Sequence, residues 1–319
     1  MNAGTPGIEA VSLTRRYGDA TVLDIENLQV GQGEAVALLG PNGAGKTTMV
    51  NILSTLITPT AGTGRVLGHD VVHEADAVRG LIGVTGQFSA VDDLLTGREN
   101  LALMADLHHL PRALGRSRTD ELLETFELVE AADRVPTTYS GGMRRRLDLA
   151  MTLIGRPKVI FLDEPTTGLD PRSRRTVWEI VRGHLREGVT ILLTTQYLPE
   201  ADELADRVVV LDAGRIVADG TPEALKRQVP GGHVRVTFDT DEGLAAASAL
   251  GSRADSEHRA LTIPIDGSVA SLRGALDRLG AHESAVTDVT VHRPDLDDVF
   301  LALTGHAAAS STTITEALP

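Results

Sequence analysis

The chain has 319 residues, which is long for one domain, so we expect one large domain with a smaller one attached. Its 42% hydrophobic and 23% charged residues are typical of a globular protein, and no apolar run approaches the roughly 20 residues that cross a bilayer. The lack of cysteine excludes disulfides and thiolate metal sites, and a net charge of −14 argues against a nucleic-acid partner. The N-terminus shows no basic segment or apolar core of a signal peptide, so we expect a cytoplasmic chain unless a partner holds it at a membrane.

The first two thirds of the chain show the pattern of an α/β core. Short continuous apolar runs are expected to form buried strands, and apolar residues recur at helical spacing between residues 98 and 132. Strand and helix alternate across residues 145–211, as in a parallel sheet covered by helices. The strands are predicted at residues 8–13, 28–30, 35–39, 159–162, 190–194 and 208–211.

The composition changes after about residue 222, which predicts a domain boundary there. Residues 223–305 are expected to form a small α+β accessory or regulatory domain with a ferredoxin-like arrangement. Its strands are predicted at residues 234–238, 260–265 and 286–291, and its helices at 241–250 and 268–279. Residues 306–319 are small and polar, and we expect them to form a disordered tail.

A glycine-rich loop follows the third predicted strand and precedes a helix that starts near Lys46. It matches G-x-x-x-x-G-K-[ST] in the strand–loop–helix context that this pattern requires. Its residues are Gly40, Pro41, Asn42, Gly43, Ala44, Gly45, Lys46, Thr47 and Thr48. Glycines let consecutive N–H groups turn inward around phosphates, and the helix N-terminus adds partial positive charge. The loop predicts a nucleoside triphosphate site, with Lys46 on the β and γ phosphates and Thr47 on Mg²⁺.

Two carboxylates stand at the end of the apolar run at residues 159–162. Asp163 is expected to hold Mg²⁺, directly or through water, because a hard cation prefers oxygen ligands. Glu164 then lies where it can polarise a water for in-line attack on the γ phosphate. The pair predicts hydrolysis of the bound triphosphate.

A second phosphate-binding turn is predicted at Ser140, Gly141, Gly142 and Met143, before an arginine-rich helix. The turn offers a hydroxyl, two unhindered N–H groups and a helix N-terminus. Two phosphate cradles in one domain are redundant unless each γ phosphate is held from two sides. We therefore expect a head-to-tail homodimer with two ATP molecules in its interface, each touched by the loop of one subunit and the turn of the other.

These three motifs resemble those of the ATP-binding-cassette (ABC) ATPases, whose signature is the serine-glycine-glycine turn. The resemblance covers about residues 8–222. It implies an ABC-type P-loop nucleotide-binding domain that uses ATP and Mg²⁺. It also implies a helical subdomain at about residues 88–145, which receives a helix of a membrane partner.

The resemblance assigns roles to further residues, position by position. Tyr17 takes the place of the aromatic residue that stacks on adenine, and Gln87 that of the glutamine that senses the γ phosphate and Mg²⁺. Asp170, in the loop after the acidic strand, takes the place of the aspartate that positions the opposite subunit. The implied metal ligands are Thr47, Gln87 and Asp163, and the implied catalytic residues are Glu164, Gln87 and Gln196.

Gln196 departs from the family pattern, which places a histidine there to contact the γ phosphate. A glutamine amide donates a hydrogen bond to a phosphate oxygen, but it carries no charge and does not titrate near neutrality. Three interpretations follow: weakened hydrolysis, hydrolysis that rests mainly on Glu164, or glutamine as a positional substitute. The last two are favoured.

Four stretches narrow the resemblance to the ATPase subunits of daunorubicin and doxorubicin resistance exporters, over about residues 8–305. They are 86–92 (GQFSAVD), 139–148 (YSGGMRRRLD), 194–198 (TTQYL) and 295–301 (DLDDVFL). This subfamily implies a subunit that powers efflux of a drug-like compound through a separate integral-membrane permease. The chain is then expected at the cytoplasmic face of the membrane, bound peripherally.

The segment from Asp295 predicts a helix with Leu296, Val299, Phe300 and Leu303 on one face. One interpretation is that this face packs the smaller domain onto the core. The other, implied by the resemblance, is a contact with the second subunit or the permease.

Two rival functions remain open from the residues. A soluble ABC ATPase of DNA repair or translation is disfavoured by the acidic charge, the single cassette and the lack of zinc cysteines or a long coiled coil. A regulatory nucleotide-binding module with low turnover is kept open by Gln196.

Overall fold

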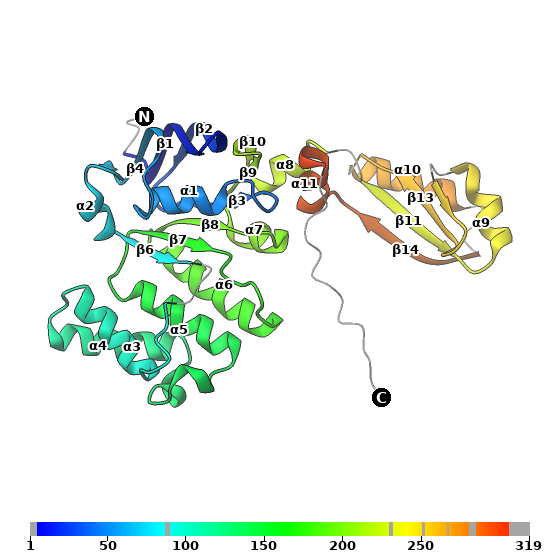
Figure 1. The fold of residues 1–319 in the computed structure, drawn as a ribbon. Coiled ribbons are helices and arrows are strands. Elements are labelled where there is room, and N and C mark those ends of the chain that lie inside the picture. The colour runs from blue at the N-terminus through cyan, green and yellow to red at the C-terminus, as the bar shows by residue number, and fades with distance from the viewer. Residues whose placement is uncertain are drawn as a thin grey trace. The chain divides into compact units, whose positions relative to one another are not determined.

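The computed structural model of the chain describes residues 5–86, 90–229, 232–250, 253–266, 268–280 and 285–305. They divide into two compact units, one up to Pro222 and one from Glu223 to Gly305, each with its own hydrophobic core (Figure 1). The short helix α8 (Pro222–Lys226) begins at this division. Gln87 and the predicted tail at 306–319 lie outside the described residues.

The first unit contains an antiparallel sheet of four strands. Their order is β2 (Ala20–Val30), β1 (Ile8–Tyr17), β4 (Ala61–Val66) and β5 (His69–Asp70). The pairing of β1 with β4 shifts register beside Ser12, which has a left-handed φ of 47°. A Cβ on Gly62 would lie 2.0 Å from the Ser12 carbonyl oxygen, so only glycine fits opposite this irregularity.

The second sheet positions the site. Its order is β10 (Arg215–Gly220), β9 (Arg207–Asp212), β3 (Ala35–Leu39), β8 (Thr190–Thr194), β7 (Val159–Asp163) and β6 (Ile82–Thr85). All pairs are parallel except β9 with β10. The loops that follow β3, β7 and β8 therefore leave the sheet at the same edge, where open α/β sheets bind their ligands.

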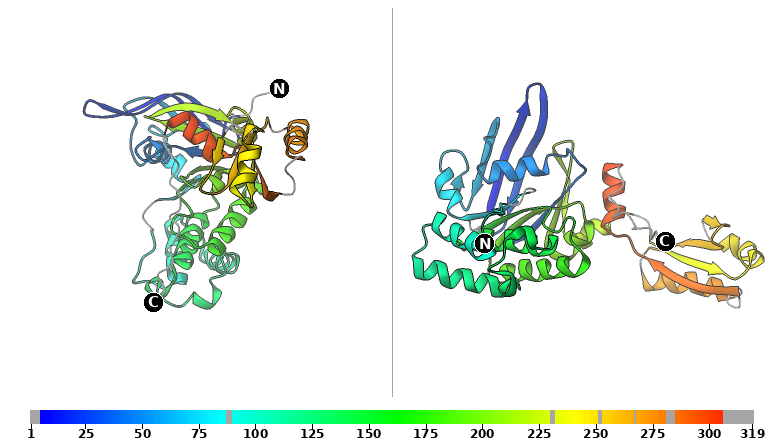
Figure 2. Two further views of the ribbon diagram at one scale, coloured as in Figure 1. Left: turned by 90° about the vertical axis from the view of Figure 1, so that its right-hand side faces the viewer. Right: turned by 60° about the horizontal axis from the view of Figure 1, so that its bottom comes forward.

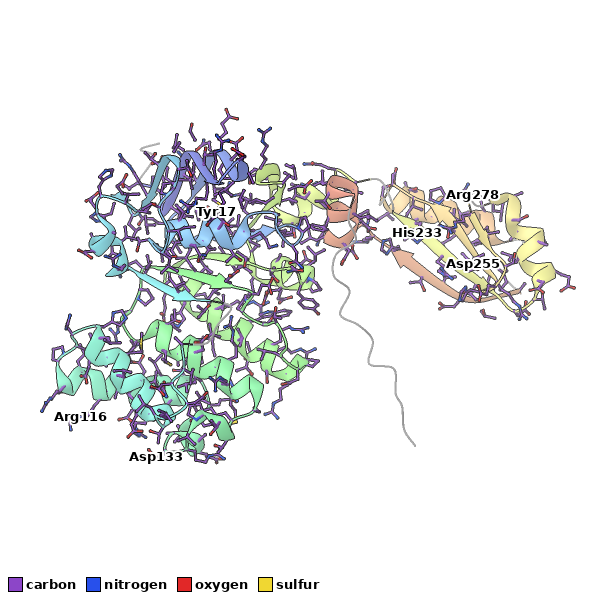
Figure 3. All side chains as sticks on the ribbon, viewed as in Figure 1. Tyr17, Arg116, Asp133, His233, Asp255 and Arg278 are labelled. Carbon is purple, nitrogen blue, oxygen red and sulfur yellow. The ribbon has the colours of Figure 1, made fainter. Side chains whose placement is uncertain are left out.

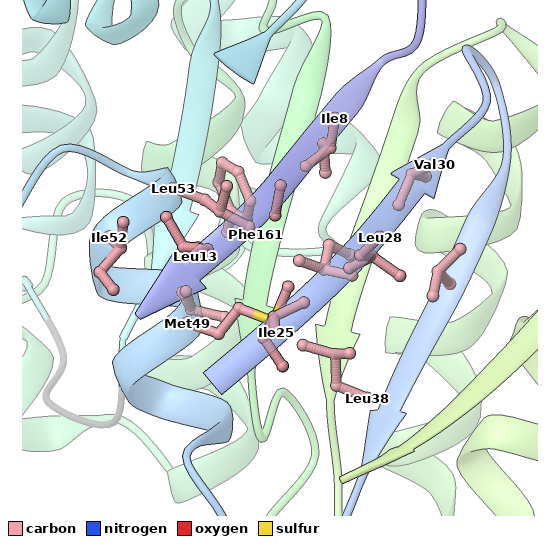
Figure 4. Packing of buried hydrophobic residues seen from close by; sticks show 14 of the residues in the cluster. Ile8, Leu13, Ile25, Leu28, Val30, Leu38, Met49, Ile52, Leu53 and Phe161 are labelled. Carbon is pink, nitrogen blue, oxygen red and sulfur yellow. The ribbon is translucent and has the colours of Figure 1, made fainter. Parts of the chain in front are cut away.

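The helices of the first unit pack beside these sheets, except that the two helices within residues 97–125 pack on each other away from the sheets (Figures 1 and 2). They are α1 (Lys46–Leu53), α2 (Ala75–Arg79), α3 (Gly97–Leu107), α4 (Arg112–Thr125), α5 (Gly141–Leu153), α6 (Pro171–Arg186) and α7 (Leu198–Leu204). Figure 4 shows the core around α1, where Met49 and Leu53 belong to one apolar cluster with Ile8 of one sheet and Phe161 of the other. Because one apolar cluster joins both sheets to α1, the helix and the loop before it are firmly placed.

The helical stretch expected at 98–132 is two helices, because Pro111 interrupts the backbone hydrogen bonds before α4. Helix α3 begins with a capping box between Thr96 and Glu99. Short 3-10 turns follow at Val129–Ala131 and Pro136–Thr138. The predicted region is therefore helical but consists of several short elements.

The second unit is a four-stranded antiparallel sheet with helices between its strands. Its elements are β11 (His233–Phe238), α9 (Asp241–Ala247), β12 (Arg253–Asp255), β13 (Ala260–Pro264), α10 (Val269–Leu279), β14 (Val286–His292) and α11 (Leu296–Thr304). The strand order β12-β13-β11-β14 with the sequence βαββαβ is the ferredoxin-like arrangement, which confirms the predicted α+β class. In α11, Leu296, Val299 and Phe300 are buried, whereas Leu303 is exposed.

The strands that the sequence analysis placed are present, with bounds that differ by a few residues at most ends. The exceptions are β1 and β2, which are much longer than predicted. Five strands were missed: β4, β5, β6, β10 and β12. β4 contains Gly62 and Gly64, and β10 alternates partly buried with exposed positions, so neither forms a continuous apolar run.

Candidate nucleotide-hydrolysis site

The loop between β3 and α1 needs glycine at specific positions. Gly43 and Gly45 have φ angles of 82° and 101°, which side chains with a Cβ rarely adopt. A Cβ on Gly40 would lie 2.4 Å from the carbonyl oxygen of Leu211 on β9. The loop thus lies tightly on the sheet and ends at Lys46, the first residue of α1. Its backbone is shaped for an anion at the helix N-terminus.

Lys46 is 6% exposed and its ammonium folds over this loop. Its Nζ donates to the carbonyl oxygens of Gly40 at 2.6 Å and Pro41 at 3.0 Å. Burial lowers the pKa of Lys46, and the nearby Glu164 and Asp163 carboxylates partly oppose this shift. The structure therefore holds a cation at the predicted phosphate site.

Asp163 ends β7 and is 3% exposed. Its carboxylate accepts from the Thr47 hydroxyl, at 3.1 Å to Oδ2, and from the Thr194 hydroxyl of β8. Thr47 and Asp163 thus bring two hard oxygen ligands together, as Mg²⁺ prefers. In the part of the chain that the structure describes, no group of three or more His, Cys, Asp or Glu side chains could hold a metal.

Glu164 follows with a left-handed φ of 49°, which costs energy for a residue other than glycine. Its N–H donates to the Thr194 carbonyl at 3.0 Å, which fixes the turn. Its carboxylate accepts from Gln196 Nε2 at 2.7 Å and from the Thr167 hydroxyl at 3.2 Å. The turn directs this carboxylate away from the strand toward the phosphate loop.

Gln196 lies in the loop after β8 and contacts the other two loops of this edge. Its Nε2 donates to Asn42 Oδ1 at 2.6 Å as well as to Glu164 Oε1. The structure thus brings Lys46 and Gln196 to the Asp163–Glu164 pair, although these three places are far apart in the sequence. They meet because β8 lies between β3 and β7 in the sheet and pairs with both in parallel.

The signature turn caps α5. Ser140 is the N-cap, and its hydroxyl accepts from the Met143 N–H at 3.2 Å. A Cβ on Gly141 would meet nothing within 4 Å, whereas one on Gly142 would lie 2.3 Å from the Ser173 hydroxyl of α6. Gly141 therefore stands open, and Gly142 packs against the next helix.

Asp170 caps α6 beside this contact. Its carboxylate accepts from the N–H groups of Arg172 and Ser173 at 3.0 Å each, and from the Ser173 hydroxyl at 2.5 Å. These hydrogen bonds, first that of the Ser173 hydroxyl, lower the pKa of Asp170. A pocket of about 380 Å³ lies between the signature helix and this loop. It is lined by Gly141, Arg144, Arg145, Asp163, Glu164, Thr167, Gly168 and Leu169.

Tyr17 ends β1 with half of its surface exposed (Figure 3). The Arg15 guanidinium lies 4.5 Å from the centre of its ring, a cation–π contact. Gln87 is outside the described residues, while its flanks Gly86 and Ala90 are described.

Three residues of the site were missed from the sequence: Thr194, Thr167 and Arg145. Thr194 and Thr167 support the two carboxylates through their hydroxyls. Thr194 could have been found from the sequence, because it is a polar residue at the end of a predicted buried strand. Arg145 lay in the arginine-rich helix after the signature, but the sequence does not separate it from its arginine neighbours.

Comparison with known proteins agrees with this geometry. The ABC transporter family model matches residues 23–167. The daunorubicin resistance ATP-binding protein DrrA3 of Streptomyces coeruleorubidus is 50% identical, covering 91% of this chain and 93% of that protein. The daunorubicin/doxorubicin resistance ATP-binding protein DrrA of Streptomyces peucetius is 46% identical over 97% and 96%. A Nod factor export ATP-binding protein I of Ralstonia nicotianae is 39% identical over 94% of both chains.

Two solved structures share the fold. One is the ATP-binding subunit of an ABC transporter, with a TM-score of 0.64 and 30% identity over 69% of this chain and 92% of that one. The other is an ATP-binding cassette captured as a dimer in a post-hydrolysis state with ADP and Pi. Its TM-score is 0.62, with 26% identity over 67% of this chain and 98% of that one.

The fold and site define an ABC-type ATP hydrolase, which confirms the predicted fold class. The chain belongs to the ABC transporter ATP-binding family, within the group of daunorubicin and doxorubicin resistance ATP-binding proteins. None of the helices in the described ranges has the length and apolarity to cross a membrane.

Proposed function

We propose that this chain hydrolyses ATP to power the efflux of a drug-like or antibiotic compound through a separate integral-membrane permease. The observation that carries the catalytic part is the meeting of Lys46, Glu164 and Gln196 at one edge of the parallel sheet. The efflux part is supported by the drug-resistance relatives, whose similarity extends over both units of the chain.

In the proposed reaction, Lys46 binds the β and γ phosphates and Glu164 orients the attacking water and accepts its proton. Gln196 donates to a γ-phosphate oxygen with the amide that now reaches Asn42. Thr47 and Asp163 fit Mg²⁺, with water and phosphate oxygens as its further ligands and Gln87 as the implied sensor of the metal. When bound, Mg²⁺ neutralises charge on the phosphates.

The neighbouring residues complete the nucleotide site. Tyr17 stacks on adenine with its exposed ring, and Thr48 continues the phosphate loop into α1. Ala44 is buried in the loop, and its N–H donates to the Pro41 carbonyl at 3.1 Å, which helps to hold the loop's shape around the phosphates.

The signature turn serves the ATP of a second subunit in this proposal. Ser140 to Met143 present an open glycine, Gly141, at a helix N-terminus, and Asp170 braces the adjoining helix α6. The dimeric post-hydrolysis cassette supports the two-fold arrangement. ATP binding would close the dimer and hydrolysis would reopen it, which is a lid-type cycle.

The partner and the place of action follow from the same proposal. The chain would bind the permease peripherally at the cytoplasmic face of the membrane, through the helical region that contains α3 and α4. Residues 223–305 would act as an accessory domain. The hydrogen bonds of Gln196 to Asn42 and Glu164 support glutamine as a positional substitute, rather than a regulatory module with low turnover.

The experiment expresses the chain together with a candidate integral-membrane permease and measures daunorubicin uptake into inside-out vesicles. We expect ATP-dependent uptake and multiple-turnover phosphate release, both abolished by Glu164→Gln. The control is Glu187→Gln, which changes an exposed carboxylate at the end of α6. Phosphate release without uptake of any tested drug would reject efflux as the function but keep the ATPase.

A further inference from the structure

Arg145, on the first turns of α5, binds the backbone of the turn that carries Glu164. Its Nε donates to the Pro165 carbonyl at 2.8 Å, and its Nη2 donates to the carbonyls of Asp163 at 3.2 Å and Glu164 at 3.3 Å. One guanidinium therefore holds three consecutive carbonyl groups where β7 ends. The side chain is only 14% exposed, so water competes little for these hydrogen bonds.

The same guanidinium reaches the segment that contains Gln87. Its Nη1 donates to the Gly86 carbonyl at 3.3 Å and to Asp148 Oδ2 at 3.0 Å. Asp148, one turn along α5 and 4% exposed at its side chain, accepts from the Ala90 N–H at 2.9 Å. The ion pair of Arg145 with Asp148 thus binds the backbone on both sides of residues 87–89.

We infer that Arg145, oriented by Asp148, is a positioning residue that fixes Glu164 relative to the signature helix α5. The inference rests on the proposed role of Glu164 in activating water. Because Glu164 has a left-handed φ, its turn needs support from its surroundings to persist. A shift of α5, when its N-terminus engages ATP, would then be transmitted directly to the carboxylate in the same subunit.

The chemistry of the contact explains why arginine stands here. A guanidinium carries its donors in a rigid planar fork and stays charged, whereas a lysine ammonium is a single donor centre on a flexible stem. A buried ion pair adds little net stability after its desolvation is counted, but it fixes geometry. We therefore expect loss of Arg145 to impair turnover more than folding.

Arg146 supplies a matched control on the same helix. Its side chain is also 14% exposed, and its Nη1 donates to the Phe126 carbonyl at 2.8 Å and to Glu127 Oε2 at 3.2 Å. These partners belong to the end of α4 and its following turn, not to the catalytic turn. A change at Arg146 therefore removes a similar buried arginine without touching the support of Glu164.

The experiment compares Arg145→Met with Arg146→Met in the full chain. It measures the affinity for a fluorescent ATP analogue, kcat and KM for ATP hydrolysis, and the thermal midpoint. A displacement of about 1 Å at a reacting group costs up to about 100-fold in rate. We therefore expect kcat of Arg145→Met to fall between about 10- and 100-fold with nucleotide affinity unchanged within threefold. Arg146→Met should keep its kcat within threefold, and Arg145→Lys should recover part of the loss.

Equal kcat losses in the two methionine variants would overturn the inference. If Arg145→Met does not fold, the pair Arg145→Lys and Arg146→Lys decides by the same comparison. Asp148→Asn keeps an acceptor for Ala90 but removes the charge that orients Arg145, and it should lower kcat less than Arg145→Met. Glu164→Gln is measured beside them: retained turnover in that variant rejects the proposed role of Glu164, which is a different result from failure at Arg145.

Discussion

The side-chain amide of Gln196 lies 2.7 Å from the carboxylate of Glu164, across the end of the parallel sheet. The same Nε2 reaches Asn42 of the phosphate loop at 2.6 Å. Glutamine therefore joins the proposed catalytic carboxylate to the phosphate loop, at the position where the family resemblance implies a histidine. Because an amide does not titrate, the Gln196 side chain stays uncharged across the physiological pH range.

The first prediction ranks Glu164 and Gln196 by how much ATPase turnover is lost when each is replaced. Glu164→Gln keeps the size and an acceptor for the Gln196 amide but removes the base, so multiple-turnover ATPase should fall by about 100-fold or more. Gln196→Ala removes two hydrogen bonds worth about 1 kcal/mol each, so turnover should fall by at most about 30-fold. Steady-state phosphate release measures both. Equal and complete loss of ATPase turnover in the two variants would contradict this ranking.

The second prediction concerns the packing of the signature turn. Gly142→Ala places a Cβ 2.3 Å from the Ser173 hydroxyl, so α5 and α6 must move apart or Ser173 must rotate away from Asp170. We expect a loss of about 1–3 kcal/mol in the free energy of unfolding, measured by denaturant titration. Gly141→Ala, which meets nothing within 4 Å, should leave stability nearly unchanged. Equal stability of the two variants would contradict the importance of the contact between Gly142 and Ser173.

The third prediction concerns the support of Asp163. Thr194 is fully buried and donates its hydroxyl to this carboxylate. Thr194→Val keeps the shape but leaves a buried carboxylate with one donor fewer, which should cost about 1–3 kcal/mol of stability. Because Asp163 is the proposed Mg²⁺ ligand, the Mg²⁺ concentration for half-maximal ATPase should also change. Thr194→Ser, which restores the hydroxyl, should recover both, and failure to do so would argue against this role.

The fourth prediction concerns Glu200 of α7, which is 1% exposed. Its Oε1 accepts from the Thr166 hydroxyl at 2.7 Å and the Trp178 Nε1–H at 3.1 Å. Burial raises the pKa of Glu200 above the ordinary 4.5, although these hydrogen bonds and the charge of Arg174 oppose the shift. The folded state then binds a proton more tightly than the unfolded state, so stability is lost as the pH rises above about 4.5.

Glu200→Gln tests this sign because it keeps the acceptor oxygen but cannot ionise. The variant should gain stability relative to the parent as the pH rises from 5 toward 8. Thermal unfolding at several pH values measures the difference. The control is Glu203→Gln on the same helix, which changes an exposed carboxylate paired with Arg182, and the change of stability with pH should be larger for Glu200→Gln. A parent and a Glu200→Gln variant with parallel pH curves would reject the raised pKa.

Much of the site was predictable because its motifs are local. The glycines of the phosphate loop, the Asp163–Glu164 pair and the capping serine of α5 each follow from a few adjacent residues. The backbone angles of Gly43 and Gly45 and the N-cap at Ser140 are as these short patterns require. Strands such as β3 and β8 were predictable because both faces are buried, which makes their sequences continuously apolar.

The less regular elements were not predictable from periodicity. β4 carries glycines and β12 has only three residues, so both depend on pairing with strands that are already formed. The contacts of Arg145 were hidden for another reason. Three adjacent arginines look alike in the sequence, but each points in a different direction from α5, and only Arg145 meets the turn after β7.

The sequence by itself predicted the chemistry: a phosphate loop, an acid proposed to bind Mg²⁺, a proposed base and a second anion turn, because each pattern needs only neighbouring residues. The sequence left three interpretations of the role of Gln196 in hydrolysis open. The tertiary structure decided which side chains meet, because the parallel order of β3, β8 and β7 brings the loop after β3 to the same edge as two loops that lie more than 100 residues further along the chain. That order places the Gln196 amide on Glu164 and Asn42, a relation that depends on long-range strand pairing and that no local pattern specifies.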